Sequence, residues 1–164
     1  MVRGLGRAIR GVARSGGGGS SSSSSQQERE RGSSHDAGPR YFSQEVKEAC
    51  WRKAEEVSGR DPERWRKDPL GNLVFRKLVG CQGCLCHDFD HIVPYSKGGP
   101  STLENCQLMQ AVANRAKGNR VDVSKTELIQ KSSYCRLSGK DMDLVELSAF
   151  GDVHHLETGG CRLQ

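Results

Sequence analysis

Apolar residues recur every three or four positions in the stretch that follows residue 43. The positions are Val46, Cys50, Trp51, Ala54 and Val57. This spacing places them on one face of a helix, so the pattern predicts an amphipathic helix over residues 44–57. Ser43 is a suitable N-cap for that helix, and Gly59 is a suitable end.

Shorter apolar runs separated by turn residues come next. Residues 61–65 predict a turn that starts a short helical piece. Residues 68–72 read Asp-Pro-Leu-Gly-Asn and predict a turn, and the apolar run at residues 73–79 predicts a strand after it. This part of the chain is therefore expected to form a hairpin-like lead-in.

The remaining pattern mixes strands and helices. It predicts strands at residues 86–93 and 105–109 and a helix at residues 110–117. Residues 126–131 and 144–150 are expected to form helical or strand-like segments that pack around them. Together these elements indicate an α+β fold.

Residues 1–42 have the composition of a disordered tail. They contain seven Arg, no Lys and three acidic residues, and residues 15–25 consist of Gly and Ser alone. Such a segment buries too little apolar surface to offset its ordering entropy. We therefore expect one folded domain after it, with a helix and hairpin at 43–80, a central motif at 81–120 and a helical extension at 121–164.

The first fourteen residues resemble an organelle presequence. Arg3, Arg7, Arg10 and Arg14 are spaced three or four apart among apolar residues, and the tail is rich in Arg and Ser. The sequence around Phe42 resembles a mitochondrial processing site with cleavage after that residue. We expect a mitochondrial or chloroplast location. The alternative is a tail without a targeting role on a cytoplasmic or nuclear protein, because its glycines weaken any helix.

The net charge of +5 lies mostly in the tail, since residues 43–164 contain 18 basic and 17 acidic residues. The folded part therefore lacks the general basic excess of many nucleic-acid-binding domains. Local basic patches occur at residues 60–77 and 115–125, and residues 141–157 are acidic. A basic groove and a merely solvated surface both fit this pattern. No stretch reaches roughly 18 consecutive apolar residues, so no membrane span is expected.

The most informative stretch begins near the end of the predicted strand at residues 86–93. Residues 90–99 read Asp-His-Ile-Val-Pro-Tyr-Ser-Lys-Gly-Gly. Asn105 follows His91 by fourteen positions, and Asn114 follows Asn105 by nine. A strand, a loop, a strand and a helix with these spacings would bring the three side chains to one point.

These side chains suit the hydrolysis of a phosphodiester bond. The imidazole of His91 has an ordinary pKa near neutrality, so it can accept a proton from water at physiological pH. The carboxylate of Asp90 and the amide oxygen of Asn114 are hard ligands that suit Mg²⁺. The sequence therefore indicates a metal-assisted hydrolytic site.

Residues 81–118 resemble the HNH family, also called the ββα-metal nucleases. The resemblance implies that His91 is the general base and that Asp90 and Asn114 hold the metal ion. It assigns Asn105 to the middle position of the motif, which fixes the loop and orients the His backbone. An Asn in place of a final His implies Mg²⁺ or Mn²⁺ rather than Zn²⁺ or Ni²⁺.

The same resemblance gives the expected substrate contacts and activity. Arg115 or Lys117 would hold a phosphate oxygen, and Gly98 and Gly99 would let the loop turn where a Cβ would clash. The implied activity is that of an endonuclease, with DNA as the favoured substrate and RNA as the alternative. A non-catalytic nucleic-acid-binding or scaffold protein that retains the fold is the second hypothesis, because the domain is nearly neutral.

Seven cysteines lie in the part of the chain after residue 42. Cys81 and Cys84 form a CxxC pair that suits half of a structural zinc site. Gln110 and Ala113 stand where many HNH proteins have a second CxxC pair, so Cys86, His87, Cys106 or Cys135 would have to complete the site. Reduced free thiols and a redox pair are the alternatives, and a disulfide framework is not expected without a secretory signal.

Overall fold

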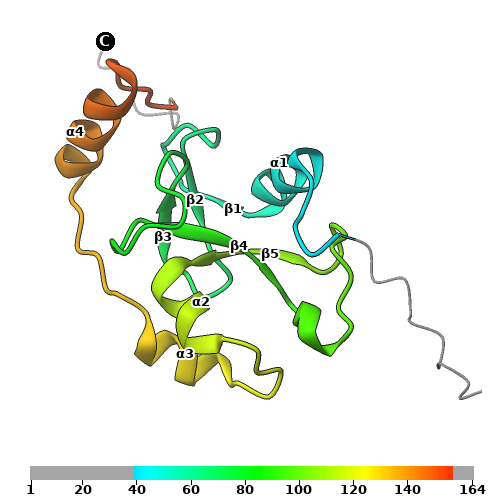
Figure 1. Ribbon diagram of the computed structural model, residues 1–164. Coiled ribbons are helices and arrows are strands. Elements are labelled where there is room, and N and C mark those ends of the chain that lie inside the picture. The colour runs from blue at the N-terminus through cyan, green and yellow to red at the C-terminus, as the bar shows by residue number, and fades with distance from the viewer. Residues whose placement is uncertain (1–38, 157–164) are drawn as a thin grey trace, which may run out of the picture. The chain divides into compact units, whose positions relative to one another are not determined.

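The computed structural model describes residues 39–156 (Figure 1). The predicted presequence and almost all of the predicted disordered tail lie outside these residues. Within the described range, four α-helices and two small antiparallel sheets form an α+β fold. The predicted fold class is therefore confirmed.

Helix α1 spans Gln44–Lys53, and Ser43 caps it by accepting a hydrogen bond from the Val46 amide at 3.3 Å. The predicted N-cap is correct, but the helix ends before residue 57. Ala54 has an extended backbone, and Glu55–Glu56 leave the helix to form strand β1. Pairing with the next strand has thus overridden the helical pattern.

The first sheet has the order β1-β2-β3, with β2 at Trp65–Lys67 and β3 at Leu73–Phe75. The predicted helical piece at residues 61–65 is a single hydrogen-bonded turn before β2. The predicted strand at residues 73–79 is shorter than expected, because the Leu78 amide turns back to the Phe75 carbonyl.

Asp68 ties the first sheet to the second. Its carboxylate accepts hydrogen bonds from the backbone amides of Leu70 and Asn72, at 2.9 and 2.8 Å, and so holds the predicted turn. It also accepts one from the backbone amide of Gln110 at 3.0 Å. Asp68 is buried, so each of these bonds satisfies a group that is removed from water.

The second sheet pairs β4 (His87–His91) with β5 (Cys106–Gln110) in antiparallel register, with His91 opposite Cys106. Helix α2 (Ala111–Lys117) follows β5 directly. The connection between the strands contains a short 3-10 helix, η1, at Tyr95–Lys97. The predicted strand, loop, strand and helix are therefore all present.

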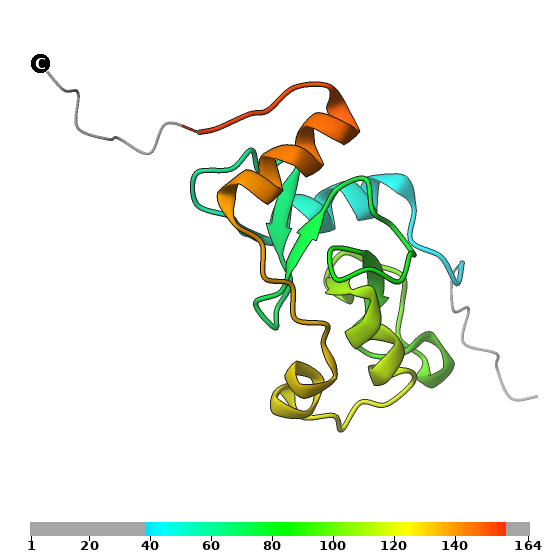
Figure 2. The ribbon, with the colours of Figure 1, turned by 90° about the vertical axis from the view of Figure 1, so that its left-hand side faces the viewer.

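Helix α3 spans Lys125–Lys131, and α4 spans Gly139–Phe150. Both views show α4 along the β2–β3 hairpin, with α2 and α3 near the opposite end of the molecule (Figures 1 and 2). Met142 of α4 belongs to a buried cluster with Trp65, Phe75 and Leu85. The C-terminal helix is thus part of the core of the domain.

A buried ion network holds α4 in place. Glu146 is fully buried, and its carboxylate accepts hydrogen bonds from Arg64 at 3.0 Å and from the indole of Trp65 at 2.7 Å. Arg60 pairs with Glu146 and with Asp143 of the same helix. Arg60 and Arg64 of the predicted basic patch therefore pair with the predicted acidic stretch, and these two arginines do not line a basic groove.

The cysteine predictions need correction. Cys81 is bonded to Cys86 and Cys84 to Cys135, whereas Cys50 and Cys106 are free and buried. Cys81 and Cys84 thus have different partners, and a bonded sulfur has no thiolate to offer to zinc. The expectation of free thiols is wrong for these four residues, because folding brings Cys135 from beyond α3 to the CxxC loop.

None of the helices in residues 39–156 is long and apolar enough to cross a membrane.

Candidate active site

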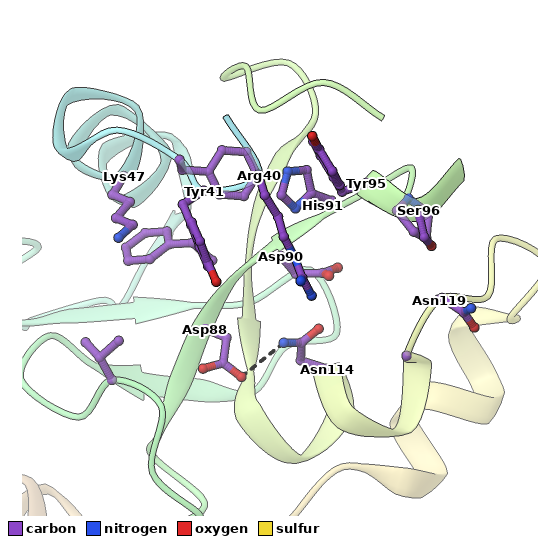
Figure 3. Close-up of a pocket in the computed structure, with 15 residues that line it drawn as sticks. Arg40, Tyr41, Lys47, Asp88, Asp90, His91, Tyr95, Ser96, Asn114 and Asn119 are labelled. Atoms are coloured by element: carbon purple, nitrogen blue, oxygen red, sulfur yellow. Dashed lines mark hydrogen bonds between the residues drawn. The ribbon is translucent and has the colours of Figure 1, made fainter. Parts of the chain in front are cut away.

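Strand β4 carries the central polar residues of the site. Successive side chains of a strand point to opposite faces, so Asp88 and Asp90 share one face while Phe89 and His91 share the other. All four line an open pocket of about 700 Å³, and Asn114 of α2 lines it as well. Figure 3 shows Asp88, Asp90 and His91 on β4 and Asn114 on α2.

Asp90 is held by two donors. One of its carboxylate oxygens, Oδ2, lies 2.9 Å from Nζ of Lys117 and accepts a hydrogen bond from Gln107 at 2.8 Å. Lys117 also donates to the backbone carbonyl of His91 at 2.8 Å and is buried. Lys117 therefore orients Asp90 and His91 from inside the fold, in place of the phosphate contact that the sequence predicted.

Asn114 is oriented by a residue that the sequence reasoning missed. Its amide Nδ2 donates to Oδ2 of Asp88 at 3.0 Å, which fixes the amide plane and leaves the amide oxygen for another partner (Figure 3). The signal was present in the sequence, because Asp88 lies two positions before Asp90 and so shares its face of the strand.

His91 is half-buried and held from two sides. Its Nε2 lies 2.9 Å from the hydroxyl of Ser101, and its ring stacks on Phe42 with centroids 4.1 Å apart. Burial lowers the pKa of His91 below its usual value; Asp90 opposes this shift, and the charges of Lys117 and Arg40 add to it. The neutral imidazole is therefore favoured near pH 7.

Asn105 holds the loop that follows His91. Its side-chain oxygen accepts a hydrogen bond from the Val93 amide at 2.8 Å, and its Nδ2 donates to the carbonyls of Val93 and Pro100. Asn105 is buried and is not among the residues that line the pocket. It therefore acts on the shape of the loop rather than on a bound substrate.

The structure places the predicted phosphate ligand Arg115 away from the pocket lining. Its guanidinium donates to the backbone carbonyl of Cys81 at 2.6 Å. The cations that line the pocket are instead Arg40, just before α1, and Lys47 in α1. The sequence analysis missed both. Arg40 falls within the predicted tail, and Lys47 lies in a helix outside the predicted motif at residues 81–120.

The donor set fits a hard divalent cation. Among the described residues no group of three His, Cys, Asp or Glu side chains is arranged to hold a metal ion. The pocket instead offers carboxylate oxygens of Asp88 and Asp90 and the amide oxygen of Asn114. Mg²⁺ takes oxygen ligands, keeps several waters and needs only one or two carboxylates from the protein, so these residues fit Mg²⁺ or Mn²⁺.

A two-stranded sheet followed by a helix, with an Asp-His pair and an Asn lining one pocket, is the arrangement that the resemblance to the HNH family implied. Residues 81–120, about a quarter of the chain, match the family model described as HNH endonuclease. The protein therefore carries an HNH domain, as the resemblance implied. No curated protein and no solved structure matches the chain.

Proposed function

We propose that this protein is a metal-dependent endonuclease that hydrolyses phosphodiester bonds in DNA. The observation that carries the proposal is the convergence of Asp90, His91 and Asn114 on one open pocket. A scaffold protein has no chemical need for two oxygen ligands, from Asp90 and Asn114, beside the half-buried imidazole of His91. The HNH match over residues 81–120 supports the same class of reaction.

Asp90 and Asn114 would hold the metal ion in this proposal. Bound Mg²⁺ or Mn²⁺ would neutralise charge on the phosphate and on the leaving oxygen. Lys117 and Gln107 fix the Asp90 carboxylate through one of its oxygens, and Asp88 fixes the Asn114 amide. Ligands that are held in this way need little reorganisation when substrate arrives.

His91 would remove a proton from the attacking water. Ser101 contacts Nε2 of the ring, so we assign the transfer to Nδ1. The stack with Phe42 fixes the ring plane, and the lowered pKa keeps the ring ready to accept a proton near neutrality. A positioned general base contributes typically a factor of about 10² to 10⁴ in rate.

The test is nicking of supercoiled plasmid by the purified full chain with Mg²⁺, Mn²⁺ or EDTA. The wild type is compared with His91→Ala and with His155→Ala, because His155 is exposed and lies outside the pocket. We expect nicking that requires metal, falls at least about 100-fold in His91→Ala and is unchanged in His155→Ala. A folded wild type that nicks with neither ion would favour the non-catalytic alternative.

The DNA substrate needs a separate comparison. Plasmid DNA and RNA of similar length, cleaved under the same metal conditions, give the ratio of kcat/KM for the two substrates. A higher kcat/KM for DNA is expected. A preference for RNA would retain the nuclease and change only its substrate.

A further inference from the structure

We propose that the segment just before α1, together with α1 itself, forms the strand-binding wall of the candidate active site. In this proposal Arg40 and Lys47 contact backbone phosphates, and Tyr41 stacks on an unpaired base. The inference rests on the proposed nuclease function and names the residues that bind its substrate. These residues lie outside the part of the chain that matches the HNH family.

The pocket is lined both by carboxylates and by cations, and these come from different elements. Asp88 and Asp90 of β4 supply the carboxylates, whereas Arg40 and Lys47 supply the two cations. Figure 3 shows the two groups of side chains approaching the pocket from different elements. A nucleic-acid strand between them would have phosphates beside the cations while the scissile phosphate faces the proposed metal ligands.

Arg40 and Lys47 are also available for binding. Neither has an ion pair or a side-chain hydrogen bond among residues 39–156. Most other arginines in this range, and Lys117, are already engaged by carboxylates or backbone carbonyls; the engaged arginines are Arg60, Arg64, Arg66, Arg76, Arg115 and Arg120. An unpaired cation binds a phosphate without first breaking an internal contact.

Phe42 anchors this wall to the fold. Its side chain is only 6 % exposed and packs with Cys50 and Cys106, while its ring stacks on His91. Arg40 and Tyr41 directly precede this anchor in the chain, so both are held at the pocket before substrate binds. Such preorganisation reduces the ordering cost of binding.

Tyr41 gives the wall its preference for unpaired bases. It lines the pocket between the two cations in sequence, and 76 % of its surface is exposed. Grooves that bind single strands combine cations with exposed aromatic side chains in this way. A base inside a duplex is stacked on its neighbours and offers no free face to Tyr41.

The cations are tested with Arg40→Gln and Lys47→Gln in the full chain. The matched controls are Arg136→Gln and Lys140→Gln, which remove the same charges at exposed positions outside the pocket. Loss of either pocket cation should raise KM for DNA about tenfold with little change in kcat. Arg40→Lys should recover part of the loss. Equal KM values in pocket and control variants would overturn this part of the proposal.

Binding of a fluorescent oligonucleotide in EDTA separates this inference from the proposed function. The logarithm of the binding constant falls linearly with the logarithm of the salt concentration. The steepness of this fall should decrease by about one for each pocket cation removed and stay unchanged in the controls. If the wild type cleaves DNA but the slopes of all variants agree, the proposed strand-binding wall is wrong and the proposed nuclease function is kept. If the wild type does not cleave DNA but the slopes of the pocket variants differ from those of the controls, the strand-binding wall is supported and the proposed nuclease function is not.

Tyr41 has a matched control in Tyr134, which is 84 % exposed and lies outside the pocket. Tyr41→Ala should weaken binding of a single-stranded oligonucleotide at least fivefold, roughly the loss of one base stack. Binding of a blunt duplex should change much less, and Tyr134→Ala should change neither. An equal effect on single strand and duplex, or no effect, would overturn the assignment of Tyr41.

Discussion

His91 is held by side chains from three separate parts of the chain. Phe42 stacks on the ring, Ser101 contacts Nε2 and Lys117 binds the backbone carbonyl. Asn105 closes the loop that follows. The ring therefore has one defined orientation, which a general base requires because a small misplacement of the reacting groups lowers the rate strongly.

Gly99 is the residue on which this loop depends most. A Cβ at Gly99 would lie 1.8 Å from the Val93 carbonyl oxygen, whereas a Cβ at Gly98 would meet nothing within 4 Å. Gly99→Ala should therefore lower the free energy of unfolding by about 3 kcal/mol or more. Gly98→Ala should cost about 1 kcal/mol, because Gly98 has a φ of 84°. Denaturant unfolding measures both, and equal losses would contradict the packing argument.

His87 should make the protein sensitive to acid. It is 1 % exposed, its Nδ1 has no hydrogen-bond partner among residues 39–156, and burial lowers its pKa from 6.5 to about 4. Between pH 6.5 and 4 the unfolded chain binds a proton at His87 and the folded protein does not, so acidification favours unfolding. The free energy of unfolding should fall about 1.4 kcal/mol per pH unit more steeply in the wild type than in His87→Gln. Equal slopes for the two proteins would argue against this role.

The individual elements are too short to be stable alone. Helices α2 and α3 have seven residues each, and the strands have between two and five. Isolated helices shorter than about 12 residues are marginal in water. The elements therefore depend on contacts between them, and the ion network at α4 and the disulfides are the most specific of these.

Removing the carboxylate of Glu146 should loosen α4. Glu146→Gln leaves Arg60 and Arg64 buried without their shared partner, which typically costs about 3 to 5 kcal/mol. Asp143 lies in α4 like Glu146, is partly exposed and pairs with Arg60. Asp143→Asn is therefore the matched control and should cost less stability. Thermal unfolding measures both variants. A similar stability of Glu146→Gln and the wild type would show that the network adds specificity rather than stability.

The Cys84–Cys135 disulfide should stabilise the domain by joining residues 51 positions apart. In the chain-entropy account a crosslink of this span contributes about 2 to 4 kcal/mol. Cys135→Ser should lose this stabilisation in oxidising buffer and should match the wild type once both are reduced. If the reduced wild type binds zinc stoichiometrically, Cys81 and Cys84 are zinc ligands, as the sequence predicted.

At the scale of the whole molecule, the folded part begins earlier than the sequence predicted. Phe42 is buried in the core, so cleavage after Phe42 would remove both this anchor and Arg40. We propose an organelle presequence that is removed before Arg40. N-terminal sequencing of the protein from isolated organelles should find a start no later than Arg40. A mature chain that starts at Ser43 would contradict both this proposal and the strand-binding wall.

The sequence by itself determined the local features of this protein. It predicted the cap at Ser43 and the order of strand, loop, strand and helix that carries Asp90, His91 and Asn114. These features follow from residues close to one another in the chain, because caps, turns and side-chain alternation are set by near neighbours.

Only the tertiary structure decided which distant residues meet. It placed Phe42 on His91, Lys117 on Asp90 and Glu146 between two arginines more than eighty positions away. It also paired the cysteines and left Arg40 and Lys47 as the cations of the site. The reason is that burial and pairing energies depend on the three-dimensional neighbours of a charge, and a residue's position in the sequence does not specify them.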